Sequence, residues 1–161
     1  MRGSRTLELD ELWSFVQRKS NKVWIWLALC RKTRQIVGYA TGPRDEDTCR
    51  TLWESIPAVY RRGRIYSDFW AAYAAVIPGW QHRAVGKETG QTSHIERFNN
   101  TLRQRLGRFV RKTLSFSKSP IMHDSCLRLF LWRYNIAIRQ RWLAGFRGVK
   151  GFRSARIRKK M

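Results

Sequence analysis

The sequence has few acidic residues. Its 11 Asp and Glu stand against 33 Lys and Arg, so the formal net charge is +22 over 161 residues. A compact domain with that charge repels itself unless a polyanion shares its surface. Nucleic acid is the expected partner, because binding to phosphates releases counterions. An anionic membrane surface is the weaker alternative.

Paired cysteines and long apolar runs are also missing. Cys30, Cys49 and Cys126 lie far apart and form no C-x-x-C pair, so no structural zinc site is expected and a reducing cytoplasm suits them. No stretch approaches the ~20 apolar residues of a membrane-spanning helix, and we find no signal peptide. We therefore expect a cytoplasmic protein without a membrane partner.

Hydrophobic residues nevertheless make up 43% of the chain, including 8 Trp and 8 Phe, which indicates a globular domain. Residues 23–30 (VWIWLALC) are apolar on both faces, as in a central strand. With residues 7–16 and 35–41 they predict an antiparallel meander. Residues 63–68 and 81–86 predict two further strands.

Helices are expected between and after these strands. Residues 45–56 open with acids, place apolar residues at helical spacing and stop at a proline, and residues 69–77 also favour a helix. Two longer helices are predicted at about 93–110 and 120–143. The second is expected to pack through apolar residues at helical spacing: Ile121, Leu127, Phe130, Leu131, Tyr134 and Ile138. The order βββ, α, β, α, β, α, α predicts a mixed α/β sheet with helices packed on it. We expect one domain over residues 1–144 and a basic, flexible tail over 145–161.

Three carboxylates stand at noteworthy points of these elements. Asp10 lies within the first strand, where charge is disfavoured. Asp68 ends the strand IYSD, where functional residues of open sheets gather. Glu96 lies in the first turn of the 93–110 helix. Each also has a structural explanation: Asp10 and Glu11 on a solvated strand edge, Asp68 as an N-cap, and Glu96 closing a capping box.

The functional interpretation of these acids is a divalent-metal site. Mg²⁺ prefers oxygen ligands, commonly one or two carboxylates together with substrate phosphate and water. Two ions roughly 3.5–4 Å apart can stabilise the attacking and leaving oxygens of an in-line phosphoryl transfer. The predicted helix has an apolar stripe of Ile95, Phe98, Leu102, Leu106 and Phe109. Glu96, Asn100 and Arg103 share the adjacent stripe. Arg103 is therefore placed to hold a phosphate near such a site.

The segments ELDELWSF, IYSDFWAAY and TSHIERFNNTLRQRLGRFVRKTLSFSKS, in this order, resemble the catalytic part of insertion-sequence-one-type bacterial transposases. That family belongs to the DDE group, whose fold is ribonuclease-H-like. The similarity covers about residues 6–135. The resemblance implies that the chain corresponds to the family's second reading frame. The family's complete enzymes also carry an upstream zinc-binding and helix-turn-helix region.

By position, the resemblance implies that Asp10, Asp68 and Glu96 are the catalytic, metal-binding triad, with Mg²⁺ as the cofactor and Mn²⁺ as a substitute. Glu11, beside Asp10, is the nearest alternative. The resemblance also implies that Arg103 contacts DNA near the cut. The remaining expected DNA-binding residues are Arg97, Asn100, Arg105, Arg108, Arg111 and Lys112.

The expected function is therefore metal-dependent cleavage and strand transfer during DNA transposition. Water would hydrolyse a phosphodiester at the element end, and the freed 3′-hydroxyl would attack target DNA. The expected partner is double-stranded DNA at the bacterial nucleoid, with oligomerisation on DNA because two ends must be held together. Two alternatives stay open: a non-catalytic basic remnant that binds nucleic acid by charge, and a ribonuclease-H-like nuclease that transfers no strands.

Overall fold

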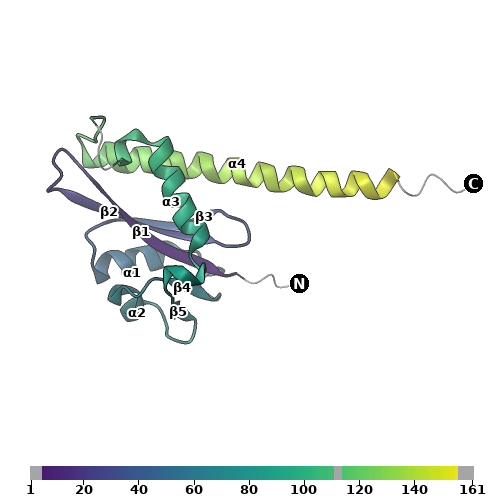
Figure 1. Ribbon diagram of the computed structural model, residues 1–161, viewed down its shortest axis with the longest axis horizontal. Helices are drawn as coiled ribbons and strands as arrows, with labels where there is room; N and C mark the ends of the chain where they lie inside the picture. The colour runs from purple at the N-terminus through teal and green to yellow at the C-terminus, as the bar shows by residue number, and fades with distance from the viewer. Residues whose placement is uncertain (1–4, 111–113, 156–161) are drawn as a thin grey trace, which may run out of the picture.

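The computed structural model describes residues 5–110 and 114–155. These residues form a five-stranded sheet with the strand order β3-β2-β1-β4-β5 (Figure 1). β1 is antiparallel to β2 and parallel to β4, so β1 is a central strand. The strands are β1 (Leu7–Phe15), β2 (Lys22–Cys30), β3 (Ile36–Gly42), β4 (Ile65–Ser67) and β5 (His82–Ala84).

The sheet separates two hydrophobic cores, and β2 contributes to both. Successive side chains of a strand point to opposite faces. Trp26 and Ala28 therefore pack in the core beneath α1 and α2, while Ile25, Leu27 and Leu29 pack in the core beneath α3 and α4. All five are essentially inaccessible to solvent. This two-sided burial explains why residues 23–30 show no polar alternation.

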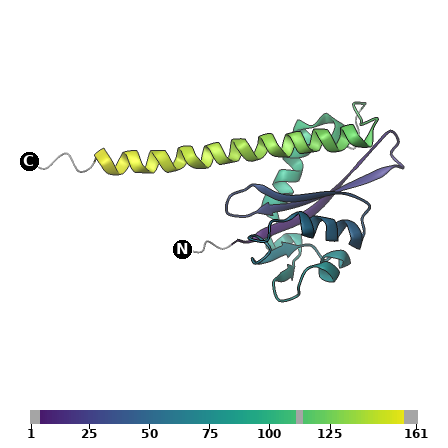
Figure 2. The same ribbon diagram turned by 180° about the vertical axis from the view of Figure 1, so that it is seen from behind.

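Helices cover both faces of the sheet. α1 and α2 lie on one side, and α3 and α4 lie on the other (Figures 1 and 2). The helices are α1 (Glu46–Ser55), α2 (Ala71–Val76), α3 (Ser93–Arg105) and α4 (Pro120–Ala155), with short 3₁₀ turns η1 (Lys87–Thr89) and η2 (Gly107–Phe109). The predicted α/β class and the predicted element order are confirmed.

The fourth helix departs from the sequence prediction. α4 runs to Ala155, so the predicted end at residue 143 is too early. Leu127 and Leu131 are buried as expected, whereas Ile121 was wrongly assigned to the packed face and is 77% exposed. The predicted boundary at residue 144 lies within the helix, residues 156–161 lie outside the described residues, and the flexible tail stays a prediction. In the described part of the chain, no helix combines the length and apolar character needed to span a bilayer.

Candidate active site

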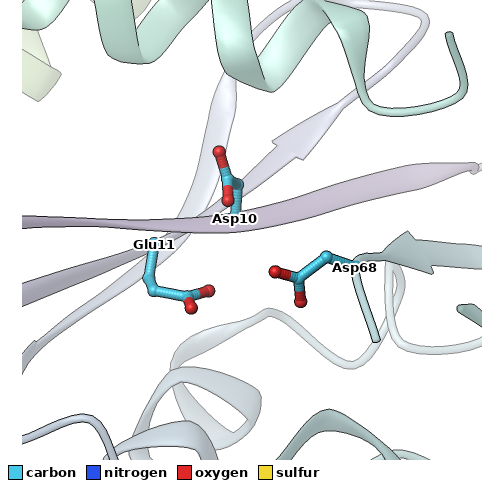
Figure 3. A group of neighbouring side chains, drawn as sticks. All are labelled: Asp10, Glu11 and Asp68. Carbon is cyan, nitrogen blue, oxygen red and sulfur yellow. The ribbon is translucent and has the colours of Figure 1, made fainter. Parts of the chain in front are cut away.

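Three carboxylates meet where β1 passes the end of β4. One oxygen from each of Asp10, Glu11 and Asp68 lies within 4.8 Å of the others. Asp10 and Glu11 leave β1 on opposite sides, as neighbours on a strand do. Figure 3 shows the carboxyl groups of Glu11 and Asp68 directed toward each other on one side of β1. The structure thus brings the predicted Asp10 and Asp68 together, with Glu11 as a third member.

Glu11 is already bound by neighbouring side chains. Its Oε1 accepts a hydrogen bond from Nε of Arg44 at 2.8 Å, and its Oε2 accepts one from the Tyr73 hydroxyl at 2.7 Å. The Glu11 side chain is only 2% exposed. Arg44 also lies over the Trp70 ring, 4.0 Å from its centroid. Glu11 therefore has both oxygens committed to protein partners, which makes it a weaker ligand candidate than Asp10.

Asp10 faces α3. Its Oδ2 accepts a hydrogen bond from Nδ2 of Asn99 at 2.7 Å. Burial raises the pKa of Asp10 to about 7, and the neighbouring charges of Glu11, Asp68 and Glu96 add to the rise. The raised pKa means that ionising Asp10 costs free energy in this environment. A bound cation would offset that cost.

Asp68 follows β4 and holds the turn that leads into α2. Its Oδ1 accepts from the backbone N–H of Trp70 at 3.0 Å. The N-cap of α2 is Trp70, without a side-chain cap, and the helix begins at Ala71, two residues later than predicted. Asp68 is therefore not the N-cap of this helix. One of its oxygens stabilises the turn instead.

Glu96 occupies the first turn of α3, as predicted. Its Oε1 accepts a hydrogen bond from the Thr92 hydroxyl at 2.7 Å, and its charge contributes to the raised pKa of Asp10. The capping-box alternative is not what the structure shows, because α3 begins at Ser93 after Thr92 and has no side-chain cap from that residue. Glu96 lies outside the group of three carboxylates within 4.8 Å.

The raised pKa of Asp10 predicts a pH-dependent stability. Its ordinary value is 3.8, so between about pH 4 and pH 7 the folded chain binds more protons than the unfolded chain. Stability of the metal-free protein should therefore fall as pH rises through this window. Asp10→Asn removes that contribution. We expect it to raise the melting temperature in EDTA clearly at pH 8 and little at pH 5.

Melting curves of both proteins at the two pH values test this expectation. The comparison isolates Asp10 because the histidines titrate equally in both proteins. An identical difference in melting temperature at pH 5 and pH 8 would show that Asp10 does not titrate in this window.

The expected DNA-binding residues follow the exposed side of α3 and the segment after it. Arg97, Asn100 and Arg105 are exposed, while Arg103 and Arg108 are half-buried. Arg111 and Lys112 lie outside the described residues. The structure thus presents part of the predicted set along one helix that starts beside the carboxylates.

Several residues of this site escaped the sequence analysis. The predicted stripe of Glu96, Asn100 and Arg103 does not include Asn99, although Asn99 is three residues after Glu96 and so also lies near it on the helix. Arg44 and Lys87 line a hollow of about 470 Å³ beside Asp68. No sequence pattern marks them, because Arg44 lies in the loop before α1 and Lys87 lies in the short turn η1.

The arrangement is ribonuclease-H-like. The sheet is mixed, one acid lies on its central strand, a second follows the adjacent parallel strand and a third lies on a covering helix. A family model described as IS1 transposase matches residues 5–137. The chain therefore belongs to the IS1 transposase family.

Individual relatives agree with this assignment. The insertion element iso-IS1n protein InsB of Shigella dysenteriae is 38% identical over 129 residues, covering 79% of this chain and 94% of that protein. The insertion element IS1 protein InsB of Shigella flexneri is 36% identical, over 77% of this chain and 92% of that protein. The insertion element IS1 4 protein InsB of Escherichia coli strain K12 is 35% identical, over 77% of this chain and 72% of that protein.

Proposed function

We propose that this chain is the catalytic domain of a DDE transposase, which cuts DNA strands and joins them to a target in a divalent-metal-dependent reaction. The observation that carries the proposal is the meeting of Asp10 and Asp68 where β1 passes the end of β4, with Glu96 close enough to influence the pKa of Asp10. Membership of the IS1 transposase family supports the same reaction class. The net charge of +22 supports DNA as the partner.

The carboxylate cluster fits a magnesium site. Asp10 and Asp68 supply carboxylate oxygens that lie within 4.8 Å of each other, while Glu11, the third acid of that group, is bound by Arg44 and Tyr73. Hard cations such as Mg²⁺ take ligands of this kind. Asp10 and Asp68 would hold the metal, Glu96 would complete the site from α3, and Mn²⁺ would substitute. When bound, the metal would supply Lewis-acid polarisation of the phosphodiester and stabilise charge on the attacking and leaving oxygens.

Neighbouring residues of the chain orient the carboxylates and would position the DNA. Asn99 fixes the rotation of the Asp10 carboxyl through its hydrogen bond to Oδ2. Thr92 does the same for Glu96. Arg103 and its basic neighbours on α3 would bind the DNA backbone and bring a phosphodiester to the carboxylates. Phosphate contacts of this kind position DNA without reading its sequence. We also propose that two copies act together on DNA, since two element ends must be joined to one target.

Cleavage, joining and salt-dependent binding assays on supplied DNA and on RNA–DNA hybrids distinguish this function from its alternatives. The protein is incubated with a nicked or 3′-hydroxyl-ended duplex and a target plasmid, in Mg²⁺, in Mn²⁺ and in EDTA. A transposase is expected to cut DNA and to join the 3′-hydroxyl end to the target only when metal is present. Cutting without joining, or cutting of RNA–DNA hybrids alone, would favour a nuclease. Salt-sensitive binding with no metal-dependent product would favour the non-catalytic remnant.

A further inference from the structure

A fourth carboxylate on β1 connects that strand to the helix that carries Glu96. Glu8 is completely buried. Its Oε2 accepts hydrogen bonds from the backbone N–H groups of His94 at 2.9 Å and Ile95 at 3.1 Å. Its Oε1 accepts from Nε of Arg31 at 2.8 Å. One side chain therefore joins β1, the end of β2 and the first turn of α3.

Glu8 caps the N-terminus of α3, a role that a residue next to the helix has in most other helices. The first N–H groups of a helix have no partner within the helix, and the helix dipole is positive there. Thr92, the N-cap of α3, gives no side-chain cap. Glu8 supplies a charged acceptor from a position 86 residues earlier in the chain. Hydrogen bonds to a charged acceptor are stronger than neutral ones, so they hold α3 at a defined place on β1.

Arg31 completes the connection from the other side. Its Nη1 donates to the side chain of Gln91 at 3.0 Å, and its Nη2 donates to the Gln91 carbonyl. Its guanidinium also lies over the Tyr66 ring, 4.5 Å from the centroid. Arg31 thereby neutralises Glu8 and ties down the loop that leads into α3. A buried carboxylate without such a partner would be strongly unfavourable.

Glu8 and Asp10 each bind α3, and the spacing of these two residues along β1 matches the spacing of their partners along α3. Glu8 and Asp10 point to the same face of β1 and are separated by about 6.7 Å along a strand. Their partners on α3, Ile95 and Asn99, are four residues apart, which is about 6 Å along a helix. β1 therefore holds α3 at two points in matching register. Glu96 lies between these two points, in the turn that Glu8 fixes.

We infer that Glu8 is a positioning residue for the metal site: it holds the first turn of α3 on β1 so that Glu96 stands near Asp10. Glu8 acts through the backbone of His94 and Ile95 and does not itself contact the metal. This inference rests on the proposed function, because it concerns the same site.

The test measures Mn²⁺ binding to the whole chain by calorimetry and amide hydrogen exchange at His94 and Ile95. Removing a residue that orients metal ligands commonly weakens metal binding about 10–100-fold, and we expect Glu8→Ala to do so. Exchange at His94 and Ile95 should accelerate while the amides of β2 stay protected. Glu8→Gln keeps an oxygen for the α3 amides but cannot neutralise Arg31. We expect it to give an intermediate Mn²⁺ affinity.

A stability control separates positioning from general weakening of the fold. Ile56→Val trims a fully buried side chain in the core on the opposite face of the sheet, and such a change lowers stability modestly. We expect it to leave the Mn²⁺ dissociation constant within about twofold of wild type. Mn²⁺ affinities of Glu8→Ala and Glu8→Gln that are also within twofold of wild type overturn the inference.

The outcomes distinguish this inference from the proposed function. Wild-type protein that binds no Mn²⁺ contradicts the proposed function, and the inference with it. Wild-type protein that binds Mn²⁺ together with unaffected Glu8 variants contradicts the inference alone. If Glu8→Ala does not fold, Glu8→Gln decides by the same twofold limit.

Discussion

Asp68→Asn and Glu96→Gln are each expected to abolish metal-dependent nicking of DNA, with a loss on the order of 10³-fold or more. Each substitution keeps the shape of the side chain and removes the charge that would hold the metal. DNA affinity should be retained or raised, because each change removes a negative charge that repels phosphate. The measurement is nicking of a supercoiled plasmid in Mn²⁺, alongside binding to a labelled duplex by fluorescence anisotropy.

Glu54→Gln is the matched control for these two variants. Glu54 is an exposed acid on α1, outside the carboxylate group. The control makes the same chemical change and should nick DNA like the wild type. Full nicking by both Asp68→Asn and Glu96→Gln would rule out the proposed mechanism. A loss that occurs equally in Glu54→Gln would show an effect of net charge and not of the site.

The second large effect is expected on the salt dependence of DNA binding. The expected phosphate contacts come from six basic residues: Arg97, Arg103, Arg105, Arg108, Arg111 and Lys112. At about 0.9 counterions released per phosphate, log K should fall with a slope of about −5.4 against log salt. Affinity should then drop roughly 2 × 10³-fold between about 50 and 200 mM salt. Anisotropy titrations at four salt concentrations give the slope directly.

A triple variant identifies which residues cause that slope. Replacing Arg97, Arg105 and Arg108 with Ala should reduce its magnitude by about 2.7, since three contacts are removed. A matched triple replacement of Arg18, Lys19 and Arg62, which are exposed and lie on other segments, should change the slope much less. Equal reductions in both variants would mean that DNA is bound by overall charge and not along α3.

The sequence was most informative where one local pattern decides the structure. The apolar run of β2 predicted a strand buried on both faces, and Ile25, Trp26 and Leu27 are all buried on its two sides. The apolar stripe of α3 predicted the burial of Ile95 and Leu102. In these elements the periodicity of the chain and the burial of its side chains carry the same information.

The sequence was least informative where a contact joins distant segments. Ser93 and Glu96 match a local capping pattern, yet the carboxylate that accepts from the α3 amides belongs to Glu8, on another element. Asn99 was passed over because its hydrogen bond to Asp10 depends on how α3 packs on β1. The end of α4 was missed for a different reason: the glycines after residue 144 favour a break, and the helix continues through them.

The central claim is that Asp10, Asp68 and Glu96 together hold a divalent metal. The most direct test is a crystal structure of the protein with Mn²⁺ at pH 8, using anomalous scattering to locate the ion. The account predicts a strong peak within coordination distance of the Asp10 and Asp68 carboxylates, which disappears in Asp68→Asn. A map with no peak at these carboxylates, at Mn²⁺ concentrations that support nicking, would contradict it.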